Sequence, residues 1–174
     1  MRSQKRYTNT TFTHRTDHEA GRHRPPRAPS EPRVCGTCGA VYRRRRWVTA
    51  EDAGPLVPHD GAGAPPAVVA CPACRKIAAK SPSGYVYFGG TFAQAHRDEI
   101  VRLVQAEARR AAEDNPTARL IAWERMDDGR FAVSTTTEHL AERLGQAVAK
   151  AYDGDVRYDF SHENKFARVH WHRD

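Results

Sequence analysis

The sequence lacks any long apolar run, and its first 30 residues contain no apolar segment of the kind that a secretory signal needs. A membrane-spanning helix requires about 20 predominantly apolar residues, and a secretory signal requires an apolar stretch of about 7–15 residues. We therefore expect a cytoplasmic protein. Cysteine is also scarce, with four residues in the chain, all of them in two Cys-x-x-Cys pairs. Because the cytoplasm keeps thiols reduced, such pairs favour metal binding over disulfides.

The two cysteine pairs predict a closed metal site. They are Cys35 with Cys38 and Cys71 with Cys74, and residues 39–70 separate them. A Cys-x-x-Cys turn places two thiolates on one side of a tight loop, so two such turns complete a four-sulfur tetrahedron around one zinc ion. A site of this kind has no open coordination position. We therefore predict one structural Zn²⁺ and no metal chemistry; a pair of redox sites would require a thioredoxin-like βαβ context that the sequence does not show.

An excess of positive charge is found in the first part of the chain and not in the second. Residues 81–174 carry 13 Lys and Arg against 15 Asp and Glu, whereas residues 1–80 carry 15 against six, and the whole chain has a net charge of +7. An asymmetry of this kind indicates a polyanionic partner, most often a nucleic acid. The alternative is a basic segment that only increases solubility.

The arginine run at residues 43–46 is the clearest candidate for nucleic-acid contact, because guanidinium groups match phosphate geometry and the flanking aromatic rings can stack on unpaired bases. If the run is a strand, alternate arginines point to opposite faces, so at most two share one surface. A solvated charged hairpin is the alternative. The predicted contacts are Tyr42, Arg43, Arg44, Arg45, Arg46, Trp47, Arg75 and Lys76 near the cysteines, and Arg2, Lys5, Arg6, Arg15, Arg22, Arg24 and Arg27 before them.

The chain divides into three predicted parts. Residues 1–34 are basic, Pro-rich at their end and almost free of large apolar residues, so we expect a disordered basic arm. Residues 35–80 form a zinc-ribbon-like module with the four cysteines, an exposed Gly- and Pro-rich loop over residues 51–66 and a short basic helix over 75–80. Gly39 suits the turn that leaves the first cysteine pair, because positive φ favours glycine.

Residues 81–174 predict an α+β domain with the element order β-α-β-β-α-β-β. The first strand covers 85–88, and a capping box at Thr91 and Gln94 begins a helix that ends near Pro116. Strands at 120–123 and 131–133 flank a turn at 127–129. A second helix begins within 135–138, and a hairpin ends the chain. The simplest packing is a ferredoxin-like antiparallel sheet with both helices on one face.

Two motifs together resemble a known group of proteins. One is Cys-x-x-Cys-Gly-Ala-Val-Tyr from Cys35 with a basic-Trp step at Trp47 and Cys-Pro-Ala-Cys-Arg from Cys71; the other is the threonine-rich segment at 135–145. The pairing is similar to small bacterial proteins of poorly defined function with paired Cys-x-x-Cys zinc knuckles. That group is distantly similar to the N-terminal zinc-binding region of the adaptor family that exports the large ribosomal subunit from the nucleus. The resemblance implies two zinc-knuckle pairs on a ribosome-facing surface.

The sequence therefore favours a non-enzymatic, zinc-binding protein that binds structured RNA, in particular ribosomal RNA within a ribosomal subunit. Hibernation, stress and assembly roles extend that expectation. The alternatives are a zinc-ribbon DNA-binding regulator, an adaptor in which zinc supports a protein-binding surface, and a metal-dependent hydrolase or nuclease. None of His96, His139 and His162 belongs to a pair with the i, i+4 spacing of a zinc hydrolase helix. Four cysteines also leave no open position on a metal, so no catalytic residues are predicted.

Overall fold

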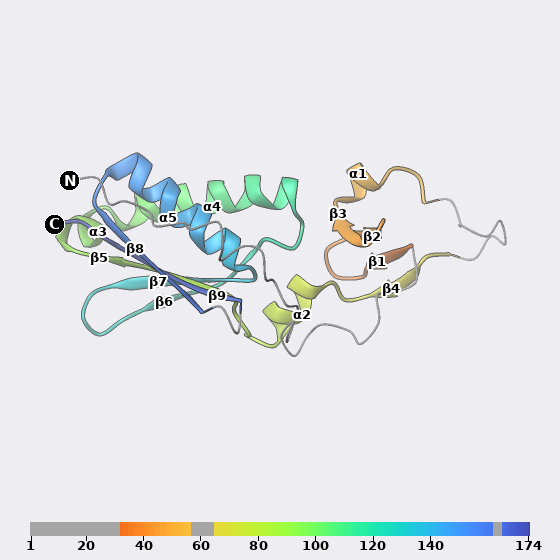
Figure 1. Ribbon diagram of the computed structural model, residues 1–174, viewed down its shortest axis with the longest axis horizontal. Coiled ribbons are helices and arrows are strands. Elements are labelled where there is room, and N and C mark those ends of the chain that lie inside the picture. Colours follow the sequence, from red (N-terminus) through yellow and green to blue (C-terminus); the bar gives the residue numbers. More distant parts are fainter. Residues whose placement is uncertain (1–31, 57–64, 162–164) are drawn as a thin grey trace, which may run out of the picture.

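The computed structural model describes residues 32–56, 65–161 and 165–174, which fold into two β-sheets with five helices (Figure 1). The α+β class is confirmed. The predicted disordered arm lies almost entirely outside the described residues. So do seven of the predicted nucleic-acid contacts, namely Arg2, Lys5, Arg6, Arg15, Arg22, Arg24 and Arg27.

The smaller sheet carries the first cysteine pair. Its strands are β1 (Arg33–Cys35), β2 (Val41–Arg43), β3 (Arg46–Val48) and β4 (Ala67–Val69), in the order β3-β2-β1-β4. Strands β1 and β4 run parallel, while the other pairs are antiparallel. Helix α1 (Ala50–Ala53) occupies the start of the segment predicted as a loop, and it begins where the Thr49 hydroxyl accepts a hydrogen bond from the Asp52 N–H at 3.1 Å. Side-chain acceptors at this position satisfy a free N–H of the first turn.

Helix α2 (Pro72–Ala78) lies between the two sheets (Figure 1) and begins at the second cysteine pair. The sequence predicted a short helix after that pair, over residues 75–80. In the structure the helix begins within the pair, at Pro72, with Cys71 as its N-cap. Proline follows Cys71 as the first helical residue, where its missing N–H costs no hydrogen bond. The Cys71 sulfur accepts a hydrogen bond from the Cys74 N–H at 3.4 Å and acts as the N-cap.

The larger sheet contains β5 (Gly84–Gly89), β6 (Leu120–Arg125), β7 (Phe131–Thr135), β8 (Asp155–Ser161) and β9 (Phe166–His172), in the order β6-β7-β5-β9-β8. The predicted sequence of strands and helices is largely present, but the predicted fully antiparallel sheet is wrong because β5 and β9 run parallel. The ferredoxin-like order is therefore not confirmed. Parallel pairing joins strands from opposite ends of the domain, which local turn signals do not reveal.

Three helices cover one face of this sheet (Figure 1): α3 (Thr91–Ala95), α4 (Arg97–Asp114) and α5 (Glu138–Tyr152). The core between them is made of fully buried side chains, including Phe88, Ile100, Leu144 and Trp171. Burial of such side chains supplies about 1.5–3 kcal/mol each, which makes this interface the main source of stability. None of the described helices is both long enough and apolar enough to span a bilayer.

The predicted capping box at Thr91 does not form. Helix α3 is capped by Gly90 without a side-chain hydrogen bond, because Thr91 is already the first helical residue. The single predicted helix is also broken at His96, whose backbone (φ −108°, ψ 24°) leaves the helical region. The His96 ring stacks on Phe92 at 4.1 Å between ring centroids, so the break packs α3 against α4.

Candidate metal centre and basic surfaces

Three elements bring the four cysteines together. Cys35 ends β1, Cys38 lies in the turn that follows, and Cys71 and Cys74 occupy the first turn of α2. The parallel pairing of β1 with β4 places Cys35 opposite Val69, two residues before Cys71. Gly39 has φ +75°, so the predicted positive-φ turn after the first pair is confirmed.

The geometry of the four sulfurs fits a tetrahedral metal ion. Their Sγ atoms all lie within 4.8 Å of one another. The distance from Cys38 Sγ to Cys71 Sγ is 3.7 Å, too long for a disulfide of about 2.05 Å. Metal–sulfur bonds of about 2.3 Å in a tetrahedron place sulfurs about 3.8 Å apart. Among the described residues, this is the one group of three or more His, Cys, Asp and Glu side chains arranged to hold a metal ion.

Burial makes the Cys71 and Cys74 thiols poor acids unless a cation is bound. Burial raises the pKa of the Cys71 and Cys74 thiols. It also acts on Cys35, but N–H groups of Cys71, Cys38 and Thr37 point toward that sulfur and lower its pKa to about 6. A coordinated metal deprotonates such thiols outright. A redox role would instead require an accessible, low-pKa nucleophile, and Cys35, the thiol with the lowered pKa, is 1% exposed.

The metal centre is tied to the larger sheet by two basic side chains that the sequence did not single out for this role. The Lys76 ammonium donates to the Thr136 carbonyl at 2.8 Å and to the Ser83 hydroxyl. Burial lowers the pKa of Lys76, while Glu138 partly opposes that shift. Arg119 approaches the Cys74 sulfur, with Nη1 at 3.9 Å. Lys76 was predicted as a nucleic-acid contact, but in the structure its ammonium joins the two parts of the protein.

The arginine run forms the tip of a hairpin rather than a continuous strand. Arg43 in β2 pairs with Arg46 in β3, and Arg44 and Arg45 are the two residues of the turn. Both turn residues have positive φ, 52° and 62°. Two-residue hairpins with positive φ at both positions favour Asn-Gly. Arg44, Arg45 and Arg46 are exposed, whereas Arg43 donates to the Ala53 carbonyl of α1.

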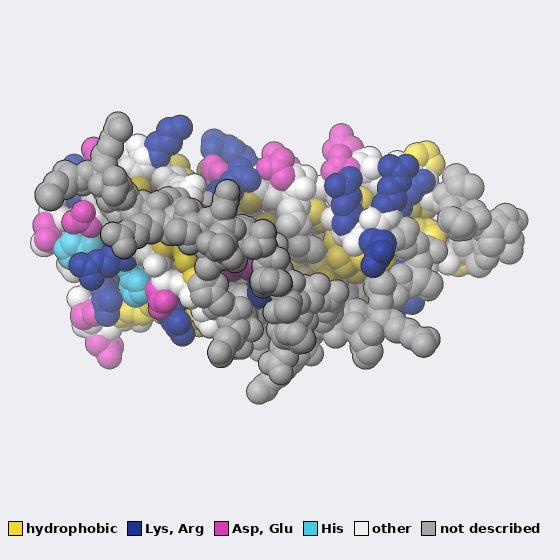
Figure 2. Space-filling view, viewed as in Figure 1, with side chains coloured by type: hydrophobic (Ala, Val, Ile, Leu, Met, Phe, Trp, Pro, Cys, Tyr) yellow, Lys and Arg dark blue, Asp and Glu magenta, His cyan; other side chains and the backbone are white. Residues whose placement is uncertain are grey.

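The other predicted contacts near the cysteines take different positions. Tyr42 is 7% exposed and packs on Trp47, with ring centroids 5.5 Å apart, so its ring is not at the surface. Trp47 is half-buried and packs against the cysteine cluster. Arg75 is half-buried in α2. The exposed surface that remains is the end of the hairpin, formed by Arg44, Arg45 and Arg46. Figure 2 shows Lys and Arg side chains gathered over the part of the protein that carries the smaller sheet, to the right of the view.

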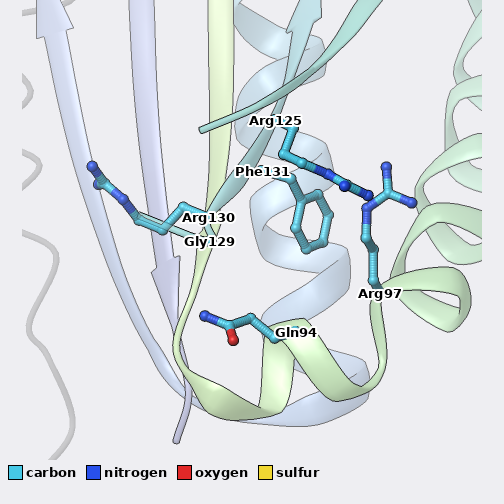
Figure 3. A pocket seen from close by; sticks show the side chains of 6 residues that line it. All are labelled: Gln94, Arg97, Arg125, Gly129, Arg130 and Phe131. Atoms are coloured by element: carbon cyan, nitrogen blue, oxygen red, sulfur yellow. The ribbon is translucent and has the colours of Figure 1, made fainter. Parts of the chain in front are cut away.

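A second basic surface lies at the far end of the larger sheet, where the sequence had indicated none. A shallow pocket of about 240 Å³ is lined by Gln94, Arg97, Gly129, Phe131 and two further arginines, Arg125 and Arg130. Figure 3 shows Arg97 and Arg125 pointing toward one another beside the Phe131 ring, and the Arg97 guanidinium lies 5.3 Å from that ring's centroid. The pocket is lined by no carboxylate.

The threonine-rich segment is structural. Thr135 and Thr136 are buried, and the Thr136 hydroxyl donates to the Thr117 carbonyl at 2.6 Å. Thr137 caps α5, since its hydroxyl accepts a hydrogen bond from the Leu140 N–H at 3.2 Å. These hydroxyl groups are therefore bonded within the protein.

No protein-family model matches the chain, and no curated protein and no solved structure is significantly similar to it.

Proposed function

We propose that the chain is a non-enzymatic, zinc-stabilised protein of the cytoplasm that binds structured RNA, in particular ribosomal RNA within a ribosomal subunit. The observation that carries this proposal is the arginine tip, which we define as Arg44, Arg45 and Arg46. These three consecutive residues are exposed at the end of a short hairpin. A backbone conformation that is unfavourable for a side-chain-bearing residue points to function when it persists at an exposed site.

The metal centre supports this role by fixing the hairpin. The β2–β3 hairpin is hydrogen-bonded to β1, which ends in Cys35. The sheet has strands of only three residues, too short to be stable in water without further support. Structural zinc contributes about 10–16 kcal/mol in small modules. The residues of this part that the structure describes, 32–56 and 65–80, include eight Lys and Arg against two Asp and Glu.

Sedimentation of a cell lysate through a sucrose gradient tests the proposal. At low salt, the protein should migrate with ribosomal particles, because phosphate contacts release counterions. At high salt, it should return to the top of the gradient. Free migration at both salt concentrations would refute the proposal and leave a protein-binding adaptor or a DNA-binding regulator as the function to test.

A further inference from the structure

The face of the larger sheet that the helices leave uncovered carries a row of four rings. Tyr85 and Tyr87 come from β5, and Phe166 and His170 come from β9. In a strand, alternate residues point to opposite faces, and the alternating residues Val86, Ala167 and Val169 are buried in the helix-covered core. All four rings remain partly exposed. We call these four residues the aromatic row.

The rings of the aromatic row form one continuous surface. Tyr87 and His170 stack with centroids 4.6 Å apart and planes inclined by 9°. Tyr85 stacks on Tyr87 at 5.7 Å with planes inclined by 23°, and Phe166 follows at 6.0 Å from Tyr85. Side chains opposite the tyrosines on β7 are small, since Ala132 pairs with Tyr87 and Ser134 with Tyr85. The rings therefore have no bulky neighbour on that strand.

Guanidinium groups surround the aromatic row. The Arg168 guanidinium lies 4.9 Å from the centroid of the Phe166 ring, and its ion pair with Asp159 is long, at 3.8 Å. Arg157 of β8 lies opposite His170 of β9 in the register of the two strands. Figure 3 shows that Arg130 extends away from Arg97 and Arg125, across the neighbouring strands.

Several arginines act on the His170 ring. Burial lowers the pKa of His170, and the charges of Arg130, Arg168 and Arg157 lower it further, against the single opposing effect of Asp159. Three arginines therefore act on this ring; Arg130 also pairs with Asp128 at 2.6 Å, and Arg168 with Asp159 at 3.8 Å. Glu124 of β6 lies at the other edge of the face, opposite Ala132 of β7. Burial raises the pKa of Tyr85, and the charge of Glu124 raises it further.

We propose that the aromatic row binds a short single-stranded segment of RNA, with bases stacked on the rings and phosphates held by Arg130, Arg157 and Arg168. Unpaired bases expose faces that stack on aromatic side chains, whereas a duplex hides them. Positive grooves with aromatic rings are the usual composition of sites for single strands. This inference rests on the proposed function: the arginine tip contacts a structured region, and the aromatic row takes an unpaired segment of the same RNA.

The test measures two ligands with the full-length, metal-loaded protein. One is a fluorescent, unstructured oligouridine of about eight nucleotides, within the range of about 4–16 nucleotides that such platforms cover; the other is a ribosomal RNA fragment. Replacing Tyr85→Leu and Tyr87→Leu keeps apolar volume but removes the rings. Because each stacked base contributes about 1–3 kcal/mol, or roughly 5- to 150-fold in affinity, we expect oligouridine binding to weaken by at least about fivefold.

The matched variant carries Arg44→Asn and Arg45→Gly at the arginine tip, and it should retain oligouridine binding while losing affinity for the ribosomal fragment. If the tyrosine variant fails to fold, Arg157→Gln with Arg168→Gln replaces it, and the slope of log affinity against log salt should fall by about 1.4 for two phosphates of a single strand. Unchanged oligouridine binding in the folded variants would overturn the inference alone.

Two further outcomes separate the inference from its premise. Wild-type protein that binds oligouridine through the tyrosines but ignores ribosomal RNA would overturn the proposed function and leave the aromatic row as a single-strand site. Tyrosine substitutions that change the protein's oligomeric state in sedimentation, with no effect on oligouridine binding, would assign the face to contacts between copies of the chain and overturn the inference.

Discussion

Replacing the two turn arginines by Asn-Gly, the sequence that this type of turn prefers, should change the stability of the protein and its RNA binding in opposite directions. Arg44 and Arg45 both lie in the left-handed region, with φ of 52° and 62°. That region costs a residue with a side chain about 1–2 kcal/mol. Glycine at position 45 removes this cost but adds about 0.5–1 kcal/mol of backbone entropy in the unfolded chain. Asparagine at position 44 tolerates the left-handed region well.

The double variant Arg44→Asn/Arg45→Gly should therefore be more stable than the wild type by roughly 0.5–2 kcal/mol. For a chain of this length, about 1 kcal/mol corresponds to an increase of about 2–4 °C in Tm. The same variant should bind RNA more weakly. Its slope of log affinity against log salt should be smaller by about 1.4–1.8, because two phosphate contacts are lost. Thermal unfolding and fluorescence anisotropy across a salt series measure the two effects.

A control variant removes the same charge elsewhere. Arg109→Gln with Lys150→Gln changes two exposed side chains on α4 and α5, on the helix-covered side of the larger sheet. If binding depends on the arginine tip, the control should retain nearly the full salt slope. Equal loss of RNA affinity in both variants would show that only net charge matters. A turn variant with a lower Tm, or with unaltered RNA affinity, would refute the reasoning from backbone conformation.

Three further predictions concern the fold and the metal. Gly145→Ala should destabilise the protein by about 1–3 kcal/mol through overpacking, although alanine favours a helix, because the added Cβ would clash with Val169 Cγ1. Thermal unfolding measures the loss, and a higher Tm would contradict it. Glu107 accepts a hydrogen bond from Arg143 that lowers its pKa below the usual 4.5, so Glu107→Gln should reduce the free energy of unfolding by up to about 1 kcal/mol at pH 7. This difference should disappear as the pH falls below 4.5 and through the pKa of Glu107 in the folded state. Chemical denaturation at several pH values measures it, and a pH-independent difference would exclude the ion pair. Cys74→Ser should bind less than half an equivalent of zinc by metal analysis, and one full equivalent would remove that sulfur from the site.

The local chemistry of the chain predicts much of the fold. The hairpin of β6 and β7 follows from its Asp-Asp-Gly turn, where Gly129 has φ +81°. Helix α4 ends at Asp114, directly before Asn115 and Pro116, because the residue before a proline disfavours the helical conformation. The four cysteines meet as their spacing indicates. Each of these features depends on residues close in sequence or on a single stringent chemistry.

The features that sequence reasoning missed depend on distant partners. The parallel pairs β1–β4 and β5–β9 have no local signal, so the sheet order was not predictable from strand patterns. The arginine run was considered as a strand, with a solvated hairpin as the alternative, and it forms a hairpin. Residues that favour a two-residue turn are absent from the run, so the sequence did not decide between the two. Lys76 was assigned to RNA from its charge, although its ammonium bonds to Thr136, 60 positions later in the sequence.

RNA binding by metal-loaded and metal-stripped protein tests the central claim most directly. The protein is measured by anisotropy against a ribosomal RNA fragment before chelation, after chelation and after zinc is restored. If the four cysteines hold the arginine tip in place through zinc, chelation should reduce affinity and the added metal should recover it, while the larger sheet retains its thermal transition. Equal affinity in the stripped and loaded forms, with stoichiometric zinc in the latter, would contradict the account.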